Sequence, residues 1–280
     1  MSEHNKPPVN VLGKCIPCSL KCWGRGRCKC DCHRDLPFFL EAIITCVGQS
    51  DFLAHTLSHN RTLFDKILVV TAPEDKETQR VCRYWQTEAH LTDAFRTRWG
   101  EFCKGNAIND ALPKLALSDW LIHLDCDILL PPEARTVIKN AQLDKSMLYG
   151  IDRLEFKSYE RFQQFYGNPQ LHTDGGANNF VSPSHAGDDV RVGTRVTFGH
   201  MGGYIPIGFF QLWNPAHTGI VKYADGHTDA SREDNVFATQ WPRAKRGFLP
   251  ELIGYHLESE DAPMAVNWRG RKTKPFAVKR

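Results

Sequence analysis

The sequence predicts an α/β protein whose mostly parallel sheet is flanked by helices and preceded by a small cysteine-rich module. Strand-like and helix-like segments alternate from Leu36 onward with short connections, which is typical of parallel sheets. Six of the ten cysteines lie between Cys15 and Cys32 and mark the separate module. Hydrophobic residues make up 41% and charged residues 24% of the 280 positions, so the composition argues against disorder and against a membrane span.

The first half of the chain carries the clearest pattern of apolar and polar residues. In chain order it predicts a strand at residues 42–47, a helix opened by the capping residues Ser50 and Asp51, a strand at 66–71, a helix at 78–87, a helix starting near 105–106 and a strand at 120–124. Parallel sheets bind ligands at the carboxyl ends of their strands, so the residues that follow these strands are the first candidates for a site.

The second half changes character after Pro131 and Pro132. A helix is expected over about Leu154 to Tyr166, and residues 167–208 are rich in Gly, Asn, Asp and His. Such a segment is too polar for a core and too long for a simple connection, so we expect it to form a binding lid.

Two acidic residues, Asp125 and Asp127, follow the strand at residues 120–124. Because side chains alternate along a strand, both carboxylates are expected on the same side, about 6.6 Å apart. A divalent cation, alone or with a bound diphosphate, would relieve their repulsion, and oxygen ligands suit Mg²⁺ or Mn²⁺. One acid could instead simply cap the next turn. The position at the end of the third predicted parallel strand favours a metal site.

These motifs resemble the GT-A class of glycosyltransferases. The motifs are a first strand ending in Thr-Cys-Val-Gly, a second ending in an acidic turn, the Lys-Gly-Asn-Ala-Ile-Asn helix start at residues 104–109, and His-Leu-Asp-Cys-Asp at 123–127. The nearest likeness is to the large inverting family typified by processive and polymer-decorating enzymes, over roughly Phe38 to His256. It implies a nucleotide-sugar donor, foremost a UDP-sugar, and Mn²⁺ or Mg²⁺.

The resemblance also assigns roles to individual residues. The expected donor-binding residues are Thr45, Val47, Asp75, Asn106, Asp125 and Asp127. Residues 45–48 would lie against the nucleoside, and Asp75 or Glu74 near the base or ribose, although the second strand lacks the usual paired-aspartate ending. Asp127 would bind the metal directly, while Asp125 would approach the ribose or a metal-bound water. His256 matches the place of a third ligand; a lone histidine is otherwise a packed or surface residue.

Transfer with inversion needs a base that removes the proton of the acceptor hydroxyl. The pair Glu233 and Asp234 resembles the acidic pair that carries this base, with Asp234 the stronger candidate. Ser231 and Asp234 also have the spacing of a capping box, and acids are favoured in the first turn of a helix, so a capping role and a catalytic role can hold together. The aromatic stretch with Phe210, Gln211 and Trp213 suits stacking on a sugar or a base, and it equally suits a core strand.

The cysteine module offers soft ligands around a short basic loop. The candidate structural Zn²⁺ ligands are Cys15, Cys18, Cys22, Cys28, Cys30, Cys32 and His33, with room for a second ion. The C-x2-C half has a standard zinc spacing, whereas the C-x-C-x-C half does not. Disulfides are the alternative, but the first ten residues lack the apolar run of a secretory signal.

The sequence thus predicts four regions: the zinc module (1–34), a nucleotide-sugar-binding half (35–130), an acceptor-binding half with the lid (131–265) and a basic tail (266–280). A cytoplasmic location, in a bacterium or a phage-infected host, is expected. With both ends of the chain basic, the expected hydroxyl acceptor is hydroxymethylated DNA or a glycan. The alternatives are a zinc-containing nucleic-acid-binding protein with a non-catalytic body, or another enzyme using the same two aspartates, such as a nucleotidyltransferase.

Overall fold

The chain divides into two compact units, Met1–Phe38 and Phe39–Arg280. The computed structural model describes residues 38–96, 102–156, 162–163, 190–192, 197–198, 203–227 and 232–257, together with residues 230, 267, 271 and 276. Apart from Phe38, these residues belong to the second unit. No helix among these residues has the length and apolar character needed to cross a lipid bilayer.

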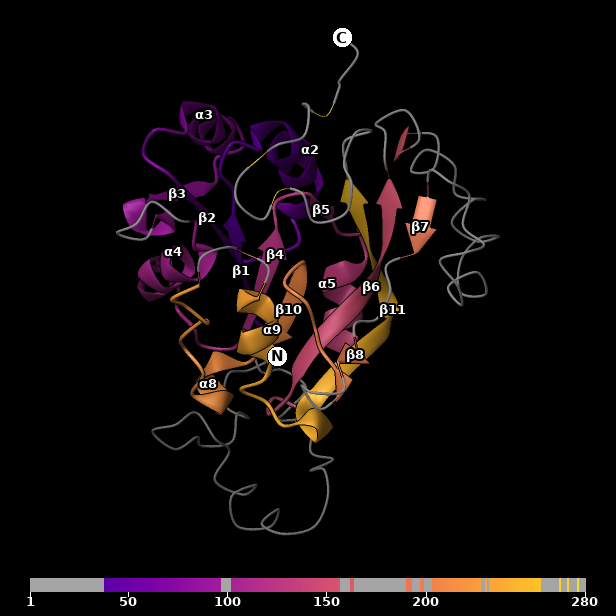
Figure 1. Ribbon diagram of the computed structural model, residues 1–280. Helices are drawn as coiled ribbons and strands as arrows, with labels where there is room; N and C mark the ends of the chain where they lie inside the picture. Colours follow the sequence, from indigo (N-terminus) through magenta and orange to yellow (C-terminus); the bar gives the residue numbers. More distant parts are fainter. Residues whose placement is uncertain are drawn as a thin grey trace, which may run out of the picture. The chain divides into compact units, whose positions relative to one another are not determined.

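The second unit is a mixed α/β structure (Figure 1). Its strands are β1 Leu40–Thr45, β2 Lys66–Thr71, β3 Glu88–Leu91, β4 Trp120–Asp125, β5 Ile128–Leu129, β6 Leu148–Phe156, β7 Val190–Val192, β8 Thr197–Phe198, β9 Gly203–Tyr204, β10 Phe210–Trp213 and β11 Arg246–Leu257. Its helices are α2 Ser50–Asn60, α3 Lys76–Tyr84, α4 Lys104–Ala111, α5 Ala134–Asn140, α8 Pro215–Thr218 and α9 Glu233–Ala238, with 3-10 turns η3 Asp93–Phe95, η4 Leu112–Lys114 and η6 Arg243–Lys245.

The main sheet has the strand order β3-β2-β1-β4-β10-β6-β11-β5, and β7 pairs with β6. Strands β1, β2 and β4 pair in parallel, as the sequence predicts, and β3 adds to β2 in parallel. The expectation of a mostly parallel sheet is nevertheless wrong for the second half, because β10 lies antiparallel between β4 and β6 and β5 is antiparallel to β11. Alternation of strands and helices stops after β4, so the pattern that predicts parallel pairing no longer applies.

One face of this sheet is covered by α4 and α9, and their packing orients the strands of the candidate site. Ile43 of β1, Leu121 of β4 and Trp213 of β10 form a buried cluster with Ala107 of α4 and Phe237 of α9. Trp213 and Phe237 meet edge to face with ring centroids 5.0 Å apart. Alternate residues of a strand share a face, so the residues two and four positions beyond Leu121 point toward the same two helices.

Several predicted elements differ in detail from the structure. The strand at 66–71 is found as predicted, whereas β3 was not predicted and makes β4 the fourth strand in sequence. The helix expected from Leu154 is wrong at its start, since β6 continues to Phe156 and pairs with β11 through that residue. Ser50 and Asp51 lie inside the first turn of α2 and do not cap it; Gln49 is the N-cap and makes no side-chain capping bond.

Candidate functional site

Asp125 is the last residue of β4 and points toward α4 and α9. It follows Leu121 and His123 at intervals of two residues, so all three side chains lie on the helix-covered face. Leu121 and His123 are fully buried, while 34% of the Asp125 side chain is exposed. The strand therefore runs from the core to its end at Asp125, where the carboxylate lies within reach of a ligand.

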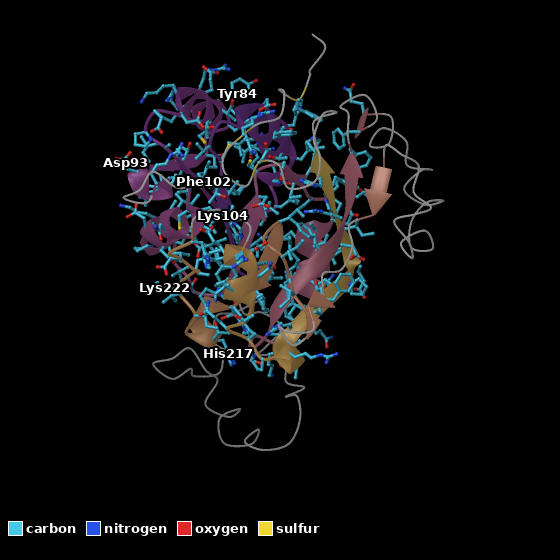
Figure 2. The ribbon with its side chains drawn as sticks, viewed as in Figure 1. Tyr84, Asp93, Phe102, Lys104, His217 and Lys222 are labelled. Carbon is cyan, nitrogen blue, oxygen red and sulfur yellow. The ribbon has the colours of Figure 1, made fainter. Side chains whose placement is uncertain are left out.

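Lys104, the first residue of α4, supplies the positive charge at this position (Figure 2). Its Nζ donates a hydrogen bond to Asp125 Oδ1 at 3.2 Å, and the residue is only 7% exposed. Burial alone would lower the pKa of Lys104, but the negative charges of Asp125, Asp234 and Glu233 raise it above the ordinary value. A buried ammonium group thus stays charged because three carboxylates surround it.

Glu233 and Asp234 begin α9 and reach this centre from the second half of the chain. Glu233 Oε2 accepts a hydrogen bond from Gly105 N of α4 at 2.9 Å, and Asp234 Oδ2 accepts one from Gly208 N at 2.7 Å. Burial raises the pKa of Glu233 to about 7. Burial also raises the pKa of Asp234, although the charge of Lys104 opposes the effect.

The capping-box alternative for this pair is not what the structure shows. The N-cap of α9 is Arg232 and makes no side-chain capping bond. Asp234 instead uses its Oδ1 to accept from the backbone N–H of Asn235 at 2.8 Å and its Oδ2 to hold Gly208. The acidic pair is therefore held by backbone N–H groups of Gly105, Gly208 and Asn235, next to Lys104. Ser231, the expected cap, lies outside the described residues.

Behind Asp125 lies a buried chain of hydrogen bonds formed by His123, Tyr223 and Gln211. The Tyr223 hydroxyl is 3.2 Å from His123 Nδ1 and donates to Gln211 Oε1 at 2.6 Å. Gln211 Nε2 donates to the carbonyl oxygens of Pro206 at 2.7 Å and of Asp234 at 3.0 Å. Burial, reinforced by the charge of Lys104, lowers the pKa of His123 to about 3, so its ring is neutral at neutral pH.

Asp127 does not continue the strand, as the sequence analysis assumed, because β4 ends at Asp125 and a tight turn leads into β5. The two carboxylates consequently have different partners. Asp127 Oδ2 lies 3.3 Å from His256 Nε2 of β11, which pairs with β5 beside the turn. Burial raises the pKa of Asp127. The contact with His256 and the charge of Arg153 lower this pKa by more, so the net shift is downward.

The side chains around Asp127 partly fit a divalent metal. Its Oδ1 is buried and has no hydrogen-bond partner, and 21% of the side chain is exposed. Together with His256, this offers one carboxylate and one imidazole, and Mg²⁺ commonly completes such sets with substrate phosphates and water. Among the residues that the structure describes, no group of three or more His, Cys, Asp or Glu side chains is arranged to hold a metal. The three-ligand set with Asp125 is therefore not assembled, because Asp125 contacts Lys104 instead.

The other expected donor-binding residues lie at the same edge of the sheet. Thr45 ends β1 directly beside Asp125, and Gly48 adopts a left-handed φ of 68° in the following turn. Asp75 caps α3 by accepting from Thr78 N and also accepts from Gly48 N at 2.7 Å, so its carboxylate joins the two loops. Val47 packs partly buried against the core cluster, and Asn106 Oδ1 accepts from Gly226 N at 3.4 Å. Their contacts with a nucleotide remain predictions.

Phe210 and Trp213 follow the alternative of a core strand. They are 0% and 1% exposed in β10, and Trp213 Nε1 donates to Ile220 O at 3.0 Å. Neither ring offers a face to a sugar, because both side chains are buried in the core. The expected zinc ligands at residues 15–33 lie outside the described residues.

Four residues of this centre were not predicted from the sequence: Lys104, His123, Tyr223 and Gly208. Lys104 and His123 were visible inside quoted motifs, as the first residue of a helix and as a polar residue inside an apolar strand. An added Cβ at Gly208 would come within 2.7 Å of Asp234 Cβ and 3.1 Å of Lys104 Nζ, so only glycine allows this approach. Nothing in the sequence around Tyr223 marks it as a residue of the site.

No protein-family model and no curated protein matches the sequence. Among solved structures, the chain is similar to mannosyl-3-phosphoglycerate synthase from Rubrobacter xylanophilus, with 19% identity over 43% of this chain and 41% of that chain and a TM-score of 0.36. Glucosyl-3-phosphoglycerate synthase from Mycobacterium tuberculosis has 9% identity over 81% of this chain and 73% of that chain, with a TM-score of 0.42.

The inositol-1-phosphate CTP transferase from T. maritima has 11% identity over 81% of this chain and 93% of that chain, with a TM-score of 0.42. The chain thus spans about two fifths of the Rubrobacter enzyme and most of the other two. Sugar-transferring and nucleotide-transferring enzymes occur side by side among these structures. With TM-scores below 0.5, the similarities do not bear on the activity of this chain, which has to be argued from its own residues.

Proposed function

We propose that the protein is a metal-dependent glycosyltransferase that moves a sugar from a nucleoside diphosphate sugar to a hydroxyl acceptor with inversion. Asp127 and His256 would hold the metal, Asp125 would lie on the donor side of the site, and Asp234 would act as the base. Donor-sugar contacts from the second half of the chain belong to residues other than the buried Phe210 and Trp213.

The observation that carries this proposal is that one buried cation joins the two candidate reactive carboxylates. Asp125 comes from the end of β4 and Asp234 from the start of α9, far apart in the sequence, yet both act on the ammonium group of Lys104. A purely structural ion pair needs one carboxylate. A centre with a charged lysine and three acids at the carboxyl end of a strand suits the handling of a charged substrate.

Mn²⁺ or Mg²⁺ fits beside Asp127, whose buried Oδ1 lacks a donor and whose Oδ2 faces His256. When bound, the metal would neutralise charge on the diphosphate leaving group. The protein's own contribution is to hold Lys104 charged next to Asp125, so that a second positive group is available where negative charge grows.

Asp234 suits the role of the base because burial raises its pKa while the residue stays partly exposed. A base is most effective when its pKa lies near the working pH, and a raised carboxyl pKa moves in that direction. The bond from Gly208 N fixes the direction of Oδ2. Glu233 is fully buried and bound to Gly105 N, so it supports α4 and is the weaker candidate.

The proposed acceptor class rests on the charge of the chain, not on the geometry of the site. The two basic ends of the chain favour hydroxymethylated DNA, and a glycan is the other acceptor class. DNA binding that depends on phosphates weakens steeply as salt rises, whereas transfer to a neutral saccharide does not. The slope of activity against salt concentration therefore separates the two acceptors.

The test is to incubate the protein with a panel of nucleotide sugars and each acceptor class, with and without Mn²⁺, and to identify products by mass spectrometry. We expect metal-dependent release of nucleoside diphosphate and a sugar added to the acceptor. Asp127→Asn should abolish both, whereas Asp144→Asn, at an exposed carboxylate bonded to Lys245, should not. Transfer of a nucleotide instead of a sugar, or product formation that ignores metal, would contradict the proposal.

A further inference from the structure

The hydrogen bonds behind Asp125 determine which ring nitrogen of His123 carries the proton. Gln211 Nε2 faces the carbonyl oxygens of Pro206 and Asp234, and carbonyl oxygens only accept hydrogen bonds. The NH₂ group of Gln211 therefore lies at that end, and Oε1 points the other way, toward the Tyr223 hydroxyl. This assignment follows from the chemistry of the partners and needs no observed hydrogen atoms.

The direction of the next bond follows from the first. Gln211 Oε1 is an acceptor 2.6 Å from the Tyr223 oxygen, so Tyr223 must place its single hydroxyl proton there. The Tyr223 oxygen is then an acceptor toward His123 Nδ1 at 3.2 Å, and Nδ1 must carry a hydrogen. The fully buried ring lies close to the charge of Lys104, which disfavours a second ring proton, so Nε2 presents a bare lone pair.

His123 Nε2 faces the candidate site in this state. It is buried, has no hydrogen-bond partner and lies 3.9 Å from Asp125 Oδ1. Both atoms are acceptors, so no hydrogen bond can join them directly. A donor that approaches both, such as the ammonium group of Lys104 or a water molecule, is the only group that suits the space between them.

We propose that Gln211 and Tyr223 form a positioning relay that holds His123 as an acceptor toward Asp125, so that Asp125 Oδ1 receives its hydrogen bond from Lys104 and none from His123. The reversed tautomer would instead place an Nε2–H group 3.9 Å from Asp125 Oδ1, where a shift of less than about 1 Å would let it donate to that carboxylate. The relay begins at the carbonyl of Asp234 in α9 and ends beside Asp125 on β4. It therefore connects the residue proposed as the base with the donor side of the site.

The consequence for binding rests on the proposed function, whereas the tautomer does not. Groups that lie behind the ligands of a metal site and orient or tune it typically change metal affinity 10- to 100-fold when they are altered. Gln211→Met removes the acceptor of the Tyr223 hydroxyl, whose proton then turns to His123 Nδ1. The ring proton moves to Nε2, and we expect affinity for Mn²⁺ with UDP to fall about 10-fold.

The experiment is a two-bond ¹H–¹⁵N correlation spectrum of the histidine rings, which distinguishes protonated from bare ring nitrogens. The signal missing from His123→Asn identifies His123. The wild-type protein should show a neutral ring with its proton on Nδ1 at neutral pH, and Gln211→Met should show it on Nε2. Tyr149→Phe, which removes a tyrosine hydroxyl bonded to Asp144 N outside the relay, should leave the wild-type pattern.

A wild-type ring with the proton on Nε2, or on both nitrogens, would overturn the relay without any variant. An unchanged tautomer in folded Gln211→Met would do the same, and a changed tautomer with unchanged Mn²⁺–UDP affinity would remove its positioning role. If the wild-type protein binds neither Mn²⁺ nor UDP, the proposed function fails by itself, and the tautomer measurements still decide the relay.

Discussion

Lys104 Nζ and Asp125 Oδ1 lie 3.2 Å apart where the first residue of α4 meets the last residue of β4. The lysine is buried and the aspartate is partly exposed, so the pair joins the core to the opening of the candidate site. Glu233 and Asp234 add two more negative charges around the same ammonium group. Removing the lysine would leave these carboxylates to repel one another in a poorly solvated place.

Lys104→Met is therefore expected to lower the free energy of unfolding by about 3 kcal/mol, the usual cost of breaking a buried ion pair from one side. Urea denaturation at neutral pH measures the change. Lys222→Met is the matched control, because its ion pair with Asp225 is 70% exposed on the lysine side and should cost less than about 1 kcal/mol (Figure 2). Equal losses in both variants would contradict the role assigned to Lys104.

Glu233 should make stability fall as pH rises from 4.5 to about 7. Burial raises its pKa from 4.5 to about 7, so the folded protein retains the proton longer than the unfolded chain does. Stability from this group is fully present below pH 4.5 and is lost by about pH 7, by an amount on the order of 3 kcal/mol.

The comparison with Glu233→Gln isolates this effect, since glutamine can still accept from Gly105 N but does not titrate. The difference in unfolding free energy between variant and wild type should rise across the same window and be flat outside it. Denaturation curves collected at a series of pH values measure this difference. Parallel pH profiles for the two proteins would show that Glu233 titrates normally.

Gly208→Ala should disturb the centre by steric contact alone. The added methyl group would lie 2.7 Å from Asp234 Cβ and 3.1 Å from Lys104 Nζ, and crowding of this kind typically costs about 1–3 kcal/mol. Because α9 has to move, we expect transfer activity to drop by more than the loss of stability explains at temperatures where the variant is folded.

The control for Gly208 is Gly219→Ala. Its new methyl group meets open space, but its φ of 69° imposes backbone strain of about 1–2 kcal/mol. Both variants should be destabilised, and only Gly208→Ala should lose activity. Equal turnover in the two folded variants would contradict the placement of Gly208 beside the reacting groups.

Asp51 anchors two residues near the end of the chain to α2. Arg271 binds its carboxylate through two nitrogens and lies over the Phe52 ring, and Phe276 donates its backbone N–H to Asp51 Oδ2. Arg271→Ala should lower stability by about 2 kcal/mol, as expected for a bidentate, partly buried ion pair. Arg80→Ala breaks an exposed pair with Glu77 and should cost less than about 1 kcal/mol.

The C-terminal contacts also predict a local change that urea denaturation alone does not resolve. Arg271→Ala should increase hydrogen exchange at the first turn of α2, since Asp51 and Phe52 lose their partner. Arg80→Ala should not change exchange there. Unchanged exchange at α2 in Arg271→Ala would show that the anchor does not hold this helix.

Local patterns predicted the first half of the fold well. The strand at 66–71 and the parallel pairing of β1, β2 and β4 follow from apolar runs with short connections, which depend on neighbouring residues alone. β3, with the sequence Glu-Ala-His-Leu and little burial, lacks such a run and could not be recognised. The path of β6 could not be predicted either, because its strand pairing with the distant β11 overrides local preference.

The acids Asp125, Asp127, Glu233 and Asp234 were identified from the sequence by residue type and by their position after strands or at a helix start. Their partners were decided only by tertiary structure. Asp125 contacts Lys104 and Asp127 contacts His256 because β4 ends between the two aspartates. Where a strand ends depends on its neighbours in the sheet. The charge states of the centre likewise depend on burial and on charges that are distant in sequence, which no local pattern contains.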